Sequence, residues 1–150
     1  MKRIFIAICF LLIANIVHAT EHGLVINLGS RHLISNDTEY NEENYGLGYT
    51  RYFDGTAVQL GFYDNSINNW TTYATYKVYG FESLRVKPFV MVGIATGYEI
   101  SVAPLFAVGT DIEIIKTHKL NFIVAPLVSK TTNNESHFGT VIALQYEKLF

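Results

Sequence analysis

Bulky and small side chains alternate over the first six residues of the stretch Tyr45-Gly46-Leu47-Gly48-Tyr49-Thr50-Arg51-Tyr52-Phe53, and the dipeptide Asp54-Gly55 follows it directly. Successive side chains of a β-strand point to opposite faces, so this pattern places bulky apolar residues on one face and glycines on the other. Asp-Gly between two alternating runs is a strong signal for a two-residue hairpin turn. The stretch therefore predicts a strand and a tight turn into a second strand.

The same alternation continues in both directions along the chain. We expect eight strands, at about residues 24–34, 45–53, 56–63, 70–81, 88–96, 102–115, 120–129 and 137–150. An even number of such strands is typical of outer-membrane barrels, in which apolar side chains face lipid and closure removes the strand edges. The predicted fold is an all-β, eight-stranded antiparallel up-and-down transmembrane β-barrel. A soluble barrel of the lipocalin kind is the alternative.

The amino terminus has the composition of a secretory signal peptide. Lys2 and Arg3 precede an almost wholly apolar run, residues 4–17, and the small residue Ala19 ends it. We therefore assign residues 1–19 to a cleaved signal peptide and residues 20–150 to the barrel, which we expect in the bacterial outer membrane as a monomer. The only cysteine, Cys9, leaves with the signal peptide. Without Lys2 and Arg3, 9 basic residues remain against 13 acidic ones, which argues against a nucleic-acid partner.

A polar cluster interrupts the alternation where the third predicted strand ends. Asp64, Asn65 and Ser66 place a carboxylate, an amide and a hydroxyl next to one another. The connections after the first, third, fifth and seventh strands lie on the outer side if the chain begins and ends on the periplasmic side, so this cluster is expected at the outer rim. The same residue types also close turns, and turn formation is the alternative to chemistry here.

The inward faces of the predicted strands are small and only partly polar. An eight-stranded lumen admits side chains or one slender ligand. The run Phe89 to Thr96 is apolar on both faces, so hydrocarbon lines the interior there and an acyl chain would fit it. A lumen packed by its own side chains is the alternative.

Two prolines interrupt strand runs within a repeated Val-Ala-Pro-Leu motif, at Pro104 and Pro126. Proline removes a ladder donor, so we expect a locally unpaired stretch through which a lipid tail enters sideways. Bulges or strand ends without a passage are the alternative.

Scattered short motifs over most of the chain resemble PagP-type lipid A palmitoyltransferases of the bacterial outer membrane. They are Tyr40-Asn41-Glu42, the strand with Gly46 and Gly48, the run Phe62 to Trp70, the run Val92 to Gly97, the paired prolines and the terminal Phe150. The resemblance implies an eight-stranded barrel that transfers palmitate from an outer-leaflet phospholipid to lipid A, the lipid part of lipopolysaccharide. It also implies a histidine and an adjacent Asp-Ser pair at the outer rim, with no metal or soluble cofactor.

Carried over to this chain, the resemblance assigns the family serine to Ser66 and the family histidine to His32. The candidate catalytic residues are His32, Asp64, Asn65 and Ser66, with His137 in reserve. The resemblance also implies a lumen that holds the acyl chain, which we assign to Gly46, Gly48, Gly61, Lys77 and Gly93. We assign lateral access, the passage of the lipid tail through the wall into this lumen, to Pro104 and Pro126. His22 and His118 belong to the periplasmic side.

The chain departs from the family pattern at three of these positions. Asn65 stands where the family has Asp, so the acid is displaced to Asp64 or missing. Simple alternation groups His32 with outward residues, so a bulge is needed to turn its side chain inward. Lys77 stands where the family has the glycine that floors its acyl pocket. A non-catalytic PagP-like barrel that serves as a surface or lipid-binding protein is therefore the second functional hypothesis.

Overall fold

The computed structural model of the protein describes residues 21–33, 39–81, 84–98, 101–130 and 136–150. The predicted signal peptide, residues 1–19, lies outside them, as does the side chain of the reserve candidate His137. No helix in the described ranges is long and apolar enough to cross a membrane.

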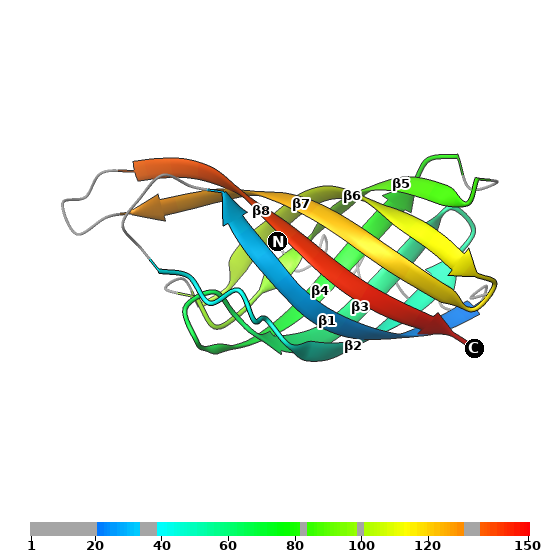
Figure 1. The fold of residues 1–150 in the computed structure, drawn as a ribbon, viewed down its shortest axis with the longest axis horizontal. Helices are drawn as coiled ribbons and strands as arrows, with labels where there is room; N and C mark the ends of the chain where they lie inside the picture. The colour runs from blue at the N-terminus through cyan, green and yellow to red at the C-terminus, as the bar shows by residue number, and fades with distance from the viewer. Residues whose placement is uncertain (1–20, 34–38, 82–83, 99–100, 131–135) are drawn as a thin grey trace, which may run out of the picture.

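Eight antiparallel strands close into one barrel, each paired with its sequence neighbours and the last with the first (Figure 1). The strands are β1 (Glu21–Leu33), β2 (Gly46–Phe53), β3 (Thr56–Asp64), β4 (Trp70–Tyr79), β5 (Val86–Ala95), β6 (Ala103–Ile115), β7 (His118–Lys130) and β8 (Ser136–Leu149). The predicted eight-stranded barrel is confirmed. Strand ends differ from the predicted ones by three residues at most, and four of them coincide, at Phe53, Thr56, Trp70 and Ile115.

The two ends of the barrel differ in how the strands are joined. At one end, two-residue turns at Asp54-Gly55 and Lys116-Thr117 join β2 to β3 and β6 to β7. Gly55 has a φ of 68°, which favours glycine over residues with a side chain. We call this the short-turn end. Residues 80–85 join β4 to β5 at the same end. The opposite end carries the connections after β1, β3, β5 and β7, none of them a two-residue turn, and we call it the long-loop end.

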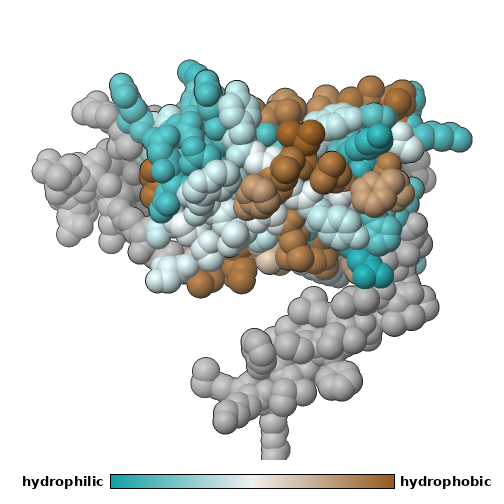
Figure 2. Space-filling model, turned by 90° about the horizontal axis from the view of Figure 1, so that it is seen from below, coloured by the Kyte–Doolittle hydropathy of each residue, from teal (hydrophilic) through white to brown (hydrophobic). Residues whose placement is uncertain are grey.

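Apolar side chains cover the outside of the barrel between its polar ends (Figure 2). They come from every strand, and they include Leu24, Ile26, Leu47, Leu60, Val78, Val90, Val92, Phe106, Val108 and Phe122. A water-soluble protein rarely exposes so much contiguous apolar surface. The alternation predicted from Tyr45 to Phe53 is the reason: Leu47 and Tyr49 are exposed, whereas Gly48 and Thr50 are buried.

The interior near the short-turn end is filled by charged side chains. Lys77, Asp111, Lys119 and Glu147 are all at least 96% buried, and we call them the ionic layer. Lys77 Nζ lies 3.9 Å from Asp111 Oδ1. The Tyr79 hydroxyl donates to Asp111 (2.8 Å), and the Tyr52 hydroxyl donates to Glu147 (2.7 Å). The expectation of an only partly polar interior is wrong near the short-turn end, because β4, β6, β7 and β8 each turn a charged side chain inward there.

Amide and apolar groups fill the interior next to the ionic layer. The Gln59 amide donates to the Tyr73 hydroxyl at 2.9 Å, and the Gln145 amide donates to Asn27 at 2.7 Å. On the wall formed by β5, β6 and β7, buried side chains make an apolar cluster: Phe89, Met91, Ala107 and Ile123. The predicted hydrocarbon lining is therefore present along β5, where the buried residues Phe89, Met91 and Ala95 are apolar.

Candidate functional site at the long-loop end

A β-bulge in β1 changes which residues face the interior. The pairing of β1 with β8 shifts between Asn27 and Gly29. Before the shift Asn27 is buried and Leu28 exposed, whereas after it Arg31 is exposed and His32 half-buried. Gly29 has a φ of 144°, and a Cβ there would lie 2.8 Å from the Glu42 carbonyl oxygen, so the bulge requires glycine. The bulge needed to turn His32 inward is confirmed.

His32 and Ser66 meet at the long-loop end. His32 Nε2 lies 2.9 Å from Ser66 Oγ, although the two residues are 34 positions apart in the sequence. The ring of Tyr40 stacks on the imidazole, with centroids 4.4 Å apart and planes at 11°. The Asn41 backbone N–H donates to the Ser66 carbonyl oxygen at 2.9 Å, which ties the connection after β1 to the connection after β3. The structure thus brings the two candidate residues into contact, while their catalytic role stays a prediction.

Asn65 holds the connection between β3 and β4 in place. Its amide donates to Thr71 Oγ1 (2.9 Å) and to the Gly97 carbonyl oxygen (2.8 Å). Its side-chain oxygen accepts the backbone N–H groups of Ile67 (2.9 Å) and Asn69 (3.0 Å). All four contacts are made by a fully buried side chain, and an aspartate cannot donate the first two. Asparagine at this position therefore suits the turn and positions Ser66.

The carboxylate that contacts His32 is Glu42, which belongs to the Tyr40-Asn41-Glu42 motif but was not predicted as a site residue. Glu42 Oε1 accepts the backbone N–H of His32 at 3.2 Å, and Oε2 accepts from Arg31 Nη1 at 2.7 Å. Asp64 instead accepts a long hydrogen bond, 3.4 Å, from Asn41. Within the described ranges, no hydrogen bond joins Asp64 to His32, so the structure does not support Asp64 as a displaced acid.

The surroundings of His32 favour its neutral form. His32 is the second-last residue of β1 and follows the exposed, charged Arg31, so it lies at the rim of the barrel. Burial lowers the pKa of His32, and the nearby Glu42 carboxylate opposes that shift. The pKa of Glu42 is itself lowered by the His32 backbone N–H and by Arg31. A neutral imidazole with Nε2 facing a hydroxyl can act as a general base.

Side chains already occupy the space beside the predicted acyl-chain glycines. A Cβ at Gly48 or at Gly61 would lie 2.6 Å from the Tyr73 hydroxyl, and a Cβ at Gly93 would lie 2.7 Å from a Thr75 methyl. A Cβ at Gly46 would overlap Tyr63, and Lys77 belongs to the ionic layer. The acyl-chain role of these residues stays a prediction, and it requires Tyr73 to turn aside.

The pairing between β6 and β7 stops halfway along the strands. Its last pair toward the long-loop end is Val108 with Val124. Beyond it, Pro104 pairs only with β5 and Pro126 only with β8 among the described residues. The break in pairing expected from the two prolines is present, and its use as a lipid passage stays a prediction.

In the described part of the chain, no group of three or more His, Cys, Asp or Glu side chains is placed to hold a metal ion.

No known family model matches this sequence, and no curated protein matches it. Among solved structures, the N-terminal β-barrel domain of Pseudomonas aeruginosa OprF is similar over 87% of this chain and 99% of that one, with 12% identity and a TM-score of 0.55. Neisserial surface protein A (NspA) is similar over 87% of this chain and 97% of its own, with 10% identity and a TM-score of 0.47. At 12% identity, the likeness to OprF concerns the fold alone.

Proposed function

We propose that this protein is an outer-membrane acyltransferase that moves a palmitate-like acyl chain from a phospholipid to lipid A. The observation that carries the proposal is the 2.9 Å contact between His32 Nε2 and Ser66 Oγ, which joins the end of β1 to the connection after β3 by means of the bulge in β1. A hydroxyl becomes a nucleophile when an adjacent base takes its proton. The half-buried position of this pair leaves it reachable from outside.

The transfer needs only Ser66, His32 and the two lipids. Ser66 Oγ attacks the ester carbonyl carbon of the donor while His32 Nε2 takes the hydroxyl proton. The ester C–O bond breaks, the lysophospholipid oxygen takes that proton, and the acyl group stays on Ser66. A hydroxyl of lipid A then attacks the acyl-serine, gives its proton to His32 and regenerates Ser66 when the proton returns to Oγ.

The outer surface and the wall support a membrane setting and a lipid substrate. The apolar band on the outside of the barrel suits a hydrocarbon environment. The halves of β6 and β7 near the long-loop end do not pair with each other, which suits sideways entry of a lipid tail between them.

A non-catalytic outer-membrane barrel is the second candidate function. The packed interior favours it, because Tyr73 covers Gly48 and Gly61 and the ionic layer fills the short-turn end. Such a protein would use its rim or outer wall to bind lipids or other molecules at the cell surface.

Mass spectrometry of lipid A distinguishes the two functions. Bacteria that express the wild-type protein are expected to contain lipid A with one additional acyl chain. Ser66→Ala and His32→Ala should each abolish this addition, and the double variant should be no worse because the two groups act as a unit. Ser101→Ala, which changes an exposed serine at the same end of the barrel, is the matched control. Unaltered lipid A, with the wild-type barrel folded in the membrane, would favour the non-catalytic function.

A further inference from the structure

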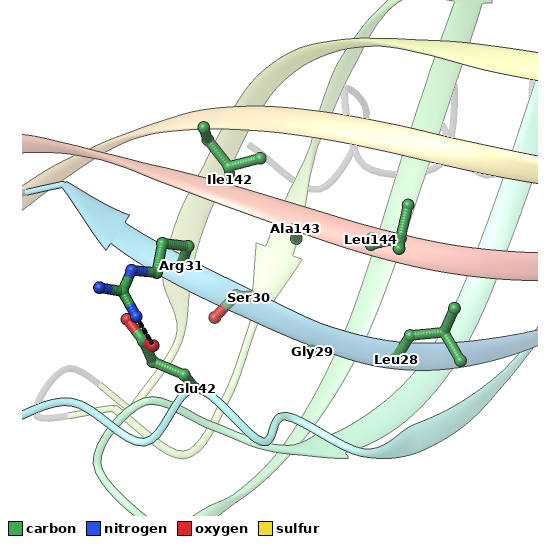
Figure 3. A pocket seen from close by; sticks show the side chains of 8 residues that line it. All are labelled: Leu28, Gly29, Ser30, Arg31, Glu42, Ile142, Ala143 and Leu144. Carbon is green, nitrogen blue, oxygen red and sulfur yellow. Dashed lines mark hydrogen bonds and ion pairs between the residues drawn. The ribbon is translucent and has the colours of Figure 1, made fainter.

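A depression of about 350 Å³ lies on the outer wall beside the bulge, across β1 and β8 (Figure 3). Its lining includes Leu28, Gly29, Arg31, Glu42, Ile142 and Leu144. The aliphatic side chains come from β1 and β8, and the charged pair lies nearer the long-loop end of β1 (Figure 3). The depression therefore has an apolar part within the apolar band and a charged part at its border.

The charged part of the depression contains a positive guanidinium and a negative carboxylate that are hydrogen-bonded to each other. Arg31 donates through Nη1 to Glu42 Oε2 at 2.7 Å, and the Arg31 side chain is 73% exposed. Its other N–H donors make no hydrogen bond with another described residue, so they can meet a ligand that approaches from the membrane side. Glu42 uses one lone pair of each oxygen, for the His32 N–H and for Arg31, so each oxygen keeps another for a further donor.

We propose that this depression binds a phospholipid with a phosphoethanolamine headgroup. The lipid phosphate accepts from the open side of the Arg31 guanidinium, and the lipid ammonium donates to the Glu42 carboxylate. The start of an acyl chain then runs along Leu28 and Leu144 toward the middle of the apolar band. A site of this volume holds the headgroup and the first part of a chain, and the rest of the lipid stays in the bilayer.

Charge complementarity selects this lipid over the others of a membrane. A phosphocholine headgroup carries a cation without N–H donors, so it cannot hydrogen-bond to Glu42. A phosphoglycerol headgroup can donate its hydroxyl groups to Glu42 but carries no cation, so the negative charge of the carboxylate is not balanced. Lipid A phosphates bring only negative charge, which the paired carboxylate opposes.

The position on β1 connects this site to the rim. Arg31 and His32 are consecutive residues, so they lie on opposite faces of the same strand, one outside and one inside. The depression would hold the acyl donor of the proposed reaction beside the strand that carries its base, and in that respect it rests on the proposed function. Binding of the headgroup itself needs no chemistry at Ser66.

The test uses the Ser66→Ala protein, so that lipid is bound and not consumed. The protein is reconstituted in vesicles with equal amounts of phosphatidylethanolamine, phosphatidylcholine and phosphatidylglycerol, extracted in mild detergent, and the retained lipids are counted by native mass spectrometry. Phosphatidylethanolamine should be retained about fivefold over the other two, the size expected of an exposed charge-assisted contact. Glu42→Gln removes the carboxylate that matches the ammonium and should remove this preference, and Arg31→Gln should lower the retention of all three lipids. Arg85→Gln, the same change as Arg31→Gln at an exposed site of the short-turn end, should alter neither.

A second variant tests the shape of the site without altering its charges. Ile142→Trp places a larger side chain in the depression and should also remove the preference. Equal retention of the three lipids by the Ser66→Ala parent, or an unchanged preference in Glu42→Gln, would overturn the proposal. Vesicles that also contain lipid A test the other lipid source: Arg31-dependent displacement of phosphatidylethanolamine by lipid A would overturn it as well.

The two proposals fail in different ways. If wild-type protein transfers no acyl chain while the Ser66→Ala protein retains phosphatidylethanolamine, the headgroup site stands and the acyltransferase does not. If acyl transfer occurs without any headgroup preference, the acyltransferase stands and the headgroup site does not.

Discussion

The ionic layer and the long-loop rim both gather polar side chains inside the barrel, but they differ in how those side chains are held. In the ionic layer, Lys77 and Asp111 are buried and face each other from strands β4 and β6. At the rim, His32 and Ser66 are half-buried and are brought together by two connections. Buried charges in a rigid wall contribute chiefly to which structure forms, whereas half-buried groups beside loops can meet a substrate.

The largest effect should come from breaking the ionic layer. Asp111→Ala removes the partner of Lys77 and the acceptor of the Tyr79 hydroxyl, which leaves a buried ammonium uncompensated. The free energy of unfolding should fall by about 3–5 kcal/mol, measured by urea unfolding in lipid vesicles. Ser66→Ala at the rim should leave it within about 0.5 kcal/mol.

A paired replacement sharpens this prediction. Lys77→Met combined with Asp111→Leu removes both charges, and its stability should lie close to the wild type, since apolar residues often replace a buried ion pair without loss. A double variant as unstable as Asp111→Ala would show that the Tyr79 contact, and not the uncompensated charge, dominates.

A smaller effect on stability is expected at Asn65, where rim geometry depends on a buried amide. Asn65→Asp removes the two donated hydrogen bonds, to Thr71 and Gly97, and should cost about 2–3 kcal/mol in the same unfolding measurement. Acyl transfer should fall with it, because Ser66 follows directly in the turn. Asn69→Asp, at an exposed site with one donated bond, is the matched control and should cost less than about 1 kcal/mol. An active, fully stable Asn65→Asp protein would contradict the positioning role.

The smallest effect should be a shift in the pH dependence of transfer. His32 must be neutral to accept a proton, so activity falls as the pH drops through its pKa. The Glu42 carboxylate raises that pKa against the effect of burial. Glu42→Gln removes the negative charge and keeps a carbonyl acceptor for the His32 N–H, so the acidic limb should move to lower pH.

This shift is measured as the pH profile of kcat/KM for acyl transfer in vesicles. Glu43→Gln, which neutralises an exposed neighbouring carboxylate, should leave the limb unchanged. A limb that moves to higher pH in Glu42→Gln would contradict a general-base role for His32 next to this carboxylate.

The sequence predicted the barrel well because each strand repeats a pattern with a period of two. The face assignments at Leu47 and Gly48, the turn at Asp54-Gly55 and the break in pairing at the two prolines all follow from local rules. The pairing of His32 with Ser66 was predicted from a family resemblance, and the alternation of β1 indicated that it needs a bulge.

Contacts that depend on three-dimensional structure could not be predicted in the same way. Glu42 lies in a connection ten residues after His32, and no periodic pattern indicates that its carboxylate returns to the strand. Asn65 could be a catalytic or a turn residue from sequence alone, and only its four partners distinguish the two. The ionic layer joins residues from β4, β6, β7 and β8, so its charges balance only once the barrel is closed.

The bulge at Gly29 shifts the alternation of inward and outward side chains along β1 by one residue. Residues before it keep one assignment of inside and outside, and residues after it take the other. Loss of one residue between the bulge and the site, at Ser30, would move the following residues by one place along β8, which would turn the His32 side chain toward lipid and the Arg31 side chain toward the interior. Evolution could therefore convert an enzyme on this scaffold into an inert barrel, or the reverse, by a single-codon deletion or insertion that leaves the sequence of the site intact.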